Sequence, residues 1–179
     1  MFYVNLEVFM KSTFLARCAL FSALICICSW ISIPIGNTTF TLQSFALILA
    51  FFVLGGRGAT VAVAVYLLLG ITGLPVFSGF RGGFGTLLNV TGGYLWGFLF
   101  ASLIYWGITA IFGEKCKIYA AVASLLSIYI CGTIWFSVYV TGGIWLILSQ
   151  SVLPYILPDA LKLLLAYTLS GRLKKLLPV

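Results

Sequence analysis

The segment that decides the fold covers residues 42–74 and reads LQSFALILAFFVLGGRGATVAVAVYLLLGITGL. Two apolar runs, residues 42–54 and 59–74, flank the sequence Gly-Gly-Arg-Gly at positions 55–58. Both runs are shorter than the roughly 20 apolar residues that normally span a bilayer. Glycine is a poor helix former, and an arginine favours the turn outside the apolar core. The segment therefore predicts two short membrane helices joined by a turn at residues 55–58.

The rest of the chain is similarly apolar. Hydrophobic residues make up 63% of the 179 residues and charged residues 7%, whereas a soluble domain carries about 25% charged residues. Four further spans are expected at residues 14–35, 87–112, 118–140 and 158–174, and the run at 144–148 is expected to lie at the membrane interface. The predicted fold class is all-α, a polytopic membrane protein in which residues 1–179 form a single domain of six transmembrane helices.

The basic residues are distributed unevenly between the two sides of the predicted bundle. Six spans place both termini on the same side, together with Lys11, Arg17, Arg57, Lys115, Lys117, Arg172, Lys174 and Lys175. The opposite, outer side carries only Arg81, and Lys162 if it lies near that surface. Cytoplasmic loops are enriched in Lys and Arg, so both termini are predicted to be cytoplasmic. The +7 charge is thus attributed to topology, and no nucleic acid partner is expected.

The composition excludes several classes of function. The chain has no histidine and only three carboxylates, Glu7, Glu114 and Asp159. It also lacks a G-x-x-x-x-G-K-[ST] phosphate loop and any C-x-x-C pair. These absences argue against a metal site, paired-carboxylate hydrolysis and ATP hydrolysis by the chain itself. We expect neither a cofactor nor enzymatic activity.

Asp159 and Lys162 are the charges most in need of explanation. They are three residues apart and so share one face of a helix. A charge near the bilayer centre costs about 2.5–3.5 kcal/mol, whereas a helical pair at this spacing returns only about 0.2–0.5 kcal/mol. Further partners, among them a ligand, are therefore expected. The alternative is structural: Pro158 begins the helix, Asp159 complements its dipole, and Lys162 extends to the interface.

Other candidate residues fall at the outer face. Glycines around Arg81 permit close approach of the backbone to a bound molecule, although a solvated flexible loop explains them equally well. Thr41 and Gln43 offer hydrogen bonds or simply cap a helix. Tyr94 is one of several aromatic residues that would either line a pocket or form an interfacial belt; the set is Phe77, Phe84, Tyr94, Trp96, Trp135 and Trp145.

The sequence also contains two small-x-x-x-small pairs, Ala19 with Ala23 and Gly93 with Gly97. Such pairs permit close packing of helices within the protein or against a partner.

Taken together, the motifs resemble those of the BioY family, the biotin-binding S components of energy-coupling-factor transporters. The motifs that carry the resemblance, in order along nearly the whole chain, are Phe40-Thr-Leu-Gln43, Gly73-Leu-Pro-Val-Phe77, Gly82-Gly-Phe-Gly85, Thr91-Gly-Gly-Tyr94 and Pro158-Asp-Ala-Leu-Lys162. One departure is Asn89-Val90 before Thr91, where the family pattern leads us to expect Gly-Pro.

The resemblance implies a six-helix membrane protein of a prokaryotic cell membrane that captures biotin from outside. The implied partners are a transmembrane coupling protein and two ATPase subunits, docked through Ala19 and Ala23. As a hypothesis, Asp159 accepts from the ureido N–H groups of biotin, while Lys162 donates to its carbonyl or offsets the charge of Asp159. The residues assigned to the tail carboxylate are Thr41, Gln43, Gly79, Arg81, Gly82 and Gly83, with aromatic side chains such as Tyr94 over the thioether ring.

Other functions remain open at this point. The alternatives are a solitary biotin carrier without ATPase partners and an S component for another vitamin such as thiamine or riboflavin. An intramembrane hydrolase using Ser78 with Lys162 as base would belong to a different class, but no oxyanion motif accompanies Ser78. A passive channel would not explain why a single Asp/Lys pair lies in the outer half of the predicted bundle.

Overall fold

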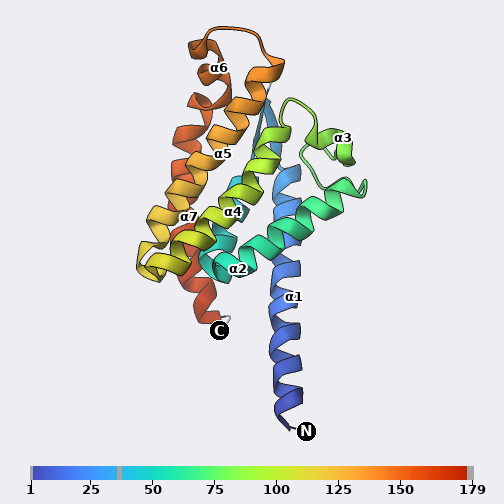
Figure 1. Ribbon diagram of the computed structural model, residues 1–179, viewed down its shortest axis with the longest axis vertical. Helices are drawn as coiled ribbons and strands as arrows, with labels where there is room; N and C mark the ends of the chain where they lie inside the picture. Colours follow the sequence, from blue (N-terminus) through green and yellow to red (C-terminus); the bar gives the residue numbers. More distant parts are fainter. Residues whose placement is uncertain (1, 36–37, 177–179) are drawn as a thin grey trace.

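The computed structural model describes residues 2–35 and 38–176, and it is mostly helical (Figure 1). The elements in order are α1 (Phe2–Trp30), β1 (Ser32–Ile35), β2 (Thr38–Thr41), α2 (Gln43–Ile71), α3 (Phe84–Leu87), α4 (Gly92–Phe112), the 3₁₀ turn η1 (Glu114–Cys116), α5 (Lys117–Tyr139), α6 (Ile144–Ser151) and α7 (Leu153–Leu176).

Five helical segments of the described chain are long and apolar enough to cross a membrane. They are Ser12–Trp30, Gln43–Ile71, Gly92–Phe112, Glu114–Tyr139 and Ile144–Lys175. The protein is therefore a multi-pass membrane protein. Six spans were predicted because residues 42–54 and 59–74 were expected to be two separate helices. In the structure both belong to α2, which counts as one of the five segments.

The break predicted at residues 55–58 is confirmed within α2. Gly55 has non-helical dihedral angles, φ 71° and ψ 179°, which only glycine adopts readily. Figure 1 shows α2 turning near its label, with one arm rising to the hairpin and the other slanting towards α3. The turn is tighter than expected because helix resumes directly after Gly55. At this corner Gly56 is pressed against α4, where an added Cβ would lie 2.4 Å from the Cα of Trp106.

The structure is mostly helical, but the prediction that the first span continues to residue 35 is wrong. The first helix ends at Trp30 instead of continuing to residue 35, and β1 pairs with β2 in an antiparallel hairpin that aligns Ile33 with Phe40. Pro34 cannot donate a helical hydrogen bond, and the flanking β-branched residues favour strand. The hairpin delivers Thr41 to the start of α2.

Two further helix boundaries differ from the prediction. Helix α4 begins at Gly92, after the short α3, instead of at residue 87. Helix α7 begins at Leu153, so Pro158 lies inside it and not at its first position. Asp159 is therefore beyond the first turn of α7, and the explanation of this carboxylate by the helix dipole does not hold.

Helix α2 is the centre of the packing and contacts α1, α4 and α7. Its buried residues include the run from Ala46 to Val53. Helices α4 and α5 pack closely as an antiparallel pair because Gly93 and Gly97 lie in their interface. A Cβ on Gly93 would lie 2.2 Å from that of Trp135, and one on Gly97 would lie 3.1 Å from the Cα of Ile128. This pair of small residues therefore serves packing inside the protein.

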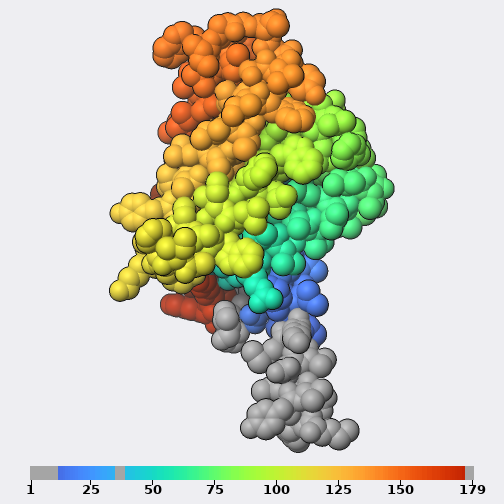
Figure 2. Space-filling view, in the orientation of Figure 1, coloured from blue at the N-terminus to red at the C-terminus, as the bar shows by residue number. Residues whose placement is uncertain are grey.

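The two ends of the molecule differ in character. The start of α1, the end of α7, the bend in α2 and the connection between α4 and α5 lie at the lower end in Figure 1, which we call the terminal end. There an ion pair of 3.9 Å joins Lys174 to Glu114. The opposite hairpin end comprises β1–β2, residues 72–91 and α6. Figure 2 shows α4 and α5 covering the front between the two ends, with residues 72–91 in green beside them. Large apolar side chains such as Tyr119 and Val138 are exposed on these helices, as expected of surfaces that face lipid.

Candidate functional site

A cavity lies within the half of the molecule nearer the hairpin end. The space between its walls, open solvent at the mouth included, is about 720 Å³. Its lining residues come from the hairpin, α2, α3, α4, α5, α7 and the connecting loops: Thr39, Thr41, Gln43, Ser44, Phe77, Ser78, Thr86, Thr91, Tyr94, Leu95, Phe98, Ile128, Tyr129, Tyr155, Asp159 and Lys162.

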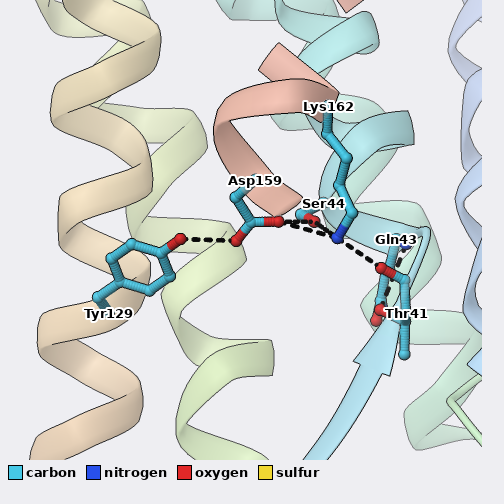
Figure 3. Close-up of polar contacts among 6 residues, drawn as sticks. All are labelled: Thr41, Gln43, Ser44, Tyr129, Asp159 and Lys162. Carbon is cyan, nitrogen blue, oxygen red and sulfur yellow. Dashed lines mark hydrogen bonds and ion pairs between the residues drawn. The ribbon is translucent and has the colours of Figure 1, made fainter. Parts of the chain in front are cut away.

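The ammonium group of Lys162 is fully bonded within the protein (Figure 3). Its Nζ donates to Oδ1 of Asp159 at 2.8 Å, to Oγ of Ser44 at 2.9 Å and to the carbonyl oxygen of Thr41 at 2.8 Å. It also lies 4.1 Å from the centre of the Phe40 ring, a cation–π contact. An ammonium group has three N–H donors, so none remains for a ligand while these bonds stand.

Asp159 retains room for one more donor. Its Oδ1 accepts from Lys162 and from the Ser44 hydroxyl at 2.8 Å. Its Oδ2 accepts from the Tyr129 hydroxyl at 2.7 Å. A carboxylate offers about two acceptor positions on each oxygen, so Oδ2 can accept one further N–H. The aspartate is thus the better placed of the two charges to contact a ligand directly.

These contacts explain how two charges are accommodated in an apolar bundle. Asp159 and Lys162 are each 6% exposed, and a buried ion pair is tolerated only where hydrogen bonds satisfy its remaining polar atoms. Ser44, Tyr129 and the carbonyl of Thr41 supply them. The additional partners that the sequence required are therefore protein groups from α2, α5 and the hairpin, with one acceptor position left open.

Five of the predicted site residues line this cavity: Thr41, Gln43, Tyr94, Asp159 and Lys162. The Gln43 amide donates to the hydroxyl of Tyr66, and the Tyr94 hydroxyl donates to the carbonyl of Ser151 at 2.7 Å. The NH₂ group of Gln43 and the hydroxyl of Tyr94 are thus engaged with the protein. The other atoms of the Gln43 and Tyr94 side chains form part of the cavity wall.

The predicted glycine loop does not line the cavity. Gly79, Arg81, Gly82 and Gly83 lie outside its wall. Arg81 is exposed, and its Nε donates to the carbonyl of Ser78 at 3.0 Å. Gly82 packs on backbone, where a Cβ would lie 2.2 Å from the carbonyl oxygen of Leu74. Positive φ angles at Gly79 and Gly83, 70° and 86°, shape the turn. The glycines therefore explain the path of the loop.

Several wall residues were missed at the level of sequence. Ser44 and Tyr129 donate to Asp159 of the ion pair, and Thr39, Thr86 and Thr91 also line the cavity. A lone serine or tyrosine in an apolar helix gives no distinctive pattern. Of the predicted aromatic residues, Phe77 and Tyr94 line the cavity, whereas Phe84 and Trp145 are exposed.

Phe77 reaches the cavity because Gly70 makes room for its ring. A Cβ on Gly70 would lie 1.9 Å from Cζ of Phe77. We predict that Gly70→Ala displaces the ring and weakens ligand binding about tenfold, measured by equilibrium binding to the purified protein. Gly107→Ala is the matched control, since no atom lies within 4 Å of a Cβ there, and it should leave the affinity unchanged. Equal affinities for the two variants would show that the Phe77 ring is not needed in the wall.

The predicted docking pair lies elsewhere on the molecule. Ala19 and Ala23 are exposed on α1, the helix that stands at the edge of the bundle in Figure 1. Ile27 continues the same exposed face. The opposite side of α1 packs on α2, where the thiol of Cys18 donates to the carbonyl of Gly58 at 3.5 Å. The outward face of α1 is thus apolar, and the two small residues Ala19 and Ala23 leave room for another helix to approach.

The fold and the cavity define a membrane-embedded ligand-binding protein, in which the cavity is built between helices and covered by loops. A family model described as the BioY family matches residues 5–179. The chain belongs to the BioY family, and the resemblance noted in the sequence is confirmed.

Individual relatives agree with this assignment. The "Biotin transporter BioY" of Thermotoga maritima is 42% identical over 164 residues, which cover 90% of this chain and 96% of that protein. The "Probable biotin transporter BioY" of Pyrococcus horikoshii is 36% identical over 165 residues, 92% of this chain and 98% of that one. Among solved structures, "the S-component for biotin from an ECF-type ABC transporter" superposes with a TM-score of 0.82 at 27% identity, covering 93% of each chain.

Proposed function

We propose that this protein is the membrane-embedded S component of a biotin uptake system. It is a transport protein and not an enzyme, as its relatives are named transporters. The observation that carries the ligand assignment beyond the family is the open acceptor position on Oδ2 of Asp159, in a cavity otherwise walled by aromatic and hydroxyl side chains. The ureido ring of biotin presents N–H donors that fit this position.

The proposed roles of the two charges follow from their bonding. Asp159 accepts a ureido N–H at Oδ2, while Lys162 balances the charge of the carboxylate and fixes its orientation through Oδ1. Thr41, Gln43 and Tyr94 complete the wall. The hydrolase alternative loses its base, because Lys162 donates to three acceptors and no hydrogen bond joins it to Ser78 within the described residues. No metal or cofactor takes part in the proposed function.

The proposed topology has six spans, with each arm of α2 crossing part of the bilayer and meeting the other at the Gly55 corner. Both termini are cytoplasmic in the membrane of a prokaryotic cell. The terminal end carries Arg57, Lys115, Lys117 and Lys174, which supports this orientation under the positive-inside rule. The cavity then opens to the outside, and residues 1–179 act as one substrate-binding unit.

The proposed partners are a transmembrane coupling protein and two ATPase subunits, with the exposed face of α1 around Ala19 and Ala23 as the docking surface. Small residues on a membrane helix allow another helix to approach closely. The alternative of a solitary biotin carrier differs only in lacking this assembly. Co-purification of ATPase subunits with the tagged protein from its native membrane would favour the assembled form.

The test of the ligand assignment is equilibrium binding of radiolabelled biotin to the purified protein in detergent. We expect saturable binding that desthiobiotin suppresses and that excess thiamine or riboflavin leaves unchanged. Desthiobiotin keeps the ureido ring and so retains the proposed contact with Asp159. Competition by thiamine or riboflavin would instead assign the protein to another vitamin, and a folded protein that binds none of the four would overturn the proposal.

A further inference from the structure

The deep part of the cavity has no capacity to neutralise a ligand anion. Asp159 and Lys162 cancel each other in charge, and all three donors of Lys162 are used. Lys162 is also the only cation in the described cavity wall. A carboxylate placed beside this pair would meet the aspartate at close range and could bind Lys162 only by breaking its existing bonds. The deep end therefore suits the neutral part of a ligand.

The part of the cavity at the hairpin end, which we call the mouth, has the opposite character. Its lining residues Thr39, Ser78 and Thr91 belong to the hairpin and the loops and are partly exposed, whereas Phe98 and Ile128, further along α4 and α5, are buried. Within the described residues, the side-chain hydroxyls of these three form no hydrogen bond, in contrast to Thr86, whose hydroxyl donates to the carbonyl of Gly82 at 3.0 Å. Three hydroxyls from the hairpin, the loop after α2 and the turn before α4 are thus available to a ligand.

A hydroxyl group both donates and accepts a hydrogen bond. It can therefore donate to a carboxylate, accept from a primary amide, or donate to an ester carbonyl with similar geometry. Arg81, whose Nε donates to the carbonyl of Ser78, is exposed and outside the wall. Ion pairs in such an exposed position change binding by only about fivefold or less. The mouth consequently has little means of distinguishing a charged tail end from a neutral one.

We infer that the cavity also binds neutral tail derivatives of its ligand, namely amides and esters of biotin, with the ring next to Asp159 and the tail end among the hydroxyls of Thr39, Ser78 and Thr91. This inference rests on the proposed function. It widens the substrate class from free biotin to its amides and esters, including conjugates to an amine, because the end of the tail lies at the mouth of the cavity. Selectivity resides in the ring, which meets the ion pair.

Competition binding against radiolabelled biotin tests this inference with biotin, biotin primary amide, biotin methyl ester and Nε-biotinyl-lysine. We expect the amide and ester to bind within about fivefold of biotin, and the bulkier lysine conjugate within about tenfold. Arg81→Gln should change the ratio of the biotin and amide affinities less than about fivefold. The triple variant Thr39→Val/Ser78→Ala/Thr91→Val should weaken acid and amide alike.

Two results would overturn the inference. Binding of the amide more than 100-fold weaker than that of biotin would mean that a cation holds the carboxylate. Tight binding of the amide with no binding of the lysine conjugate would mean that the tail end is enclosed and not at the mouth. Either result requires that biotin itself binds. Absence of biotin binding would instead contradict the proposed function.

Discussion

Asp159→Asn is expected to weaken biotin binding about 100-fold. The change removes a charged acceptor, and hydrogen bonds to charged groups contribute about 1.5–3 kcal/mol. It also places an amide N–H₂ group where the ligand presents its own N–H. Isothermal titration calorimetry on the purified variant measures this loss. Glu114→Gln is the matched control, because this carboxylate lies at the terminal end with its side chain 64% exposed, and its affinity should equal that of the wild type.

Asp159→Asn also leaves Lys162 without its counter-charge. Removing one partner of a buried ion pair typically costs about 3–5 kcal/mol of stability, so the variant should unfold at a lower temperature. The double variant Asp159→Leu/Lys162→Met removes both charges and should recover stability without recovering binding. This difference separates a role in binding from a role in folding. Wild-type affinity in the folded Asp159→Asn protein would exclude the proposed contact with the ureido group.

The second large effect is expected at the exposed face of α1. The double variant Ala19→Trp/Ala23→Trp should bind biotin normally and yet abolish ATP-driven uptake in proteoliposomes that contain the coupling protein and ATPase subunits. Two indole rings on this face would prevent a partner helix from approaching closely. The cavity should be unaffected, because both positions are exposed and the opposite side of α1 packs on α2.

Ala110→Trp is the control for bulk alone, since Ala110 is exposed on α4. It should retain uptake. Unchanged uptake in the Ala19/Ala23 double variant would place the docking surface elsewhere. Uptake by the wild-type protein without coupling and ATPase subunits would favour the solitary carrier.

The sequence predicted those features that depend on local composition. Apolar runs located the membrane helices, and the glycines at 55–58 located the corner in α2. The scarcity of charge singled out Asp159 and Lys162 and required partners for them. The hairpin was missed because residues 32–41 lie between two strongly helical segments. The first span was therefore predicted to end at residue 35 instead of at Trp30.

The contacts that complete the site depend on tertiary structure. Ser44 reaches Asp159 across 115 positions of sequence, and Tyr129 reaches it across 30. No local pattern indicates such pairings. Arg81 was selected because it is an isolated charge among glycines, but the same glycines turn its side chain towards the Ser78 carbonyl and solvent. Isolation in the sequence identified a buried ion pair in the cavity wall in one case and an exposed loop residue outside the wall in the other.

The pairing of Asp159 with Lys162 has an electrical consequence for a protein in an energised membrane. The arm of α2 between the Gly55 corner and Ser44 spans about 16 Å at roughly 1.5 Å per residue. With the proposed topology, in which the Gly55 corner lies at one face of the bilayer, this length would put the pair near the middle of a core about 30 Å thick. A lone carboxylate there would sense about half the transmembrane voltage, or about 1 kcal/mol per 100 mV. Since the pair of Asp159 and Lys162 carries no net charge, we expect the membrane potential to do almost no work on it, so that the geometry of the proposed site would not depend on the polarisation of the cell.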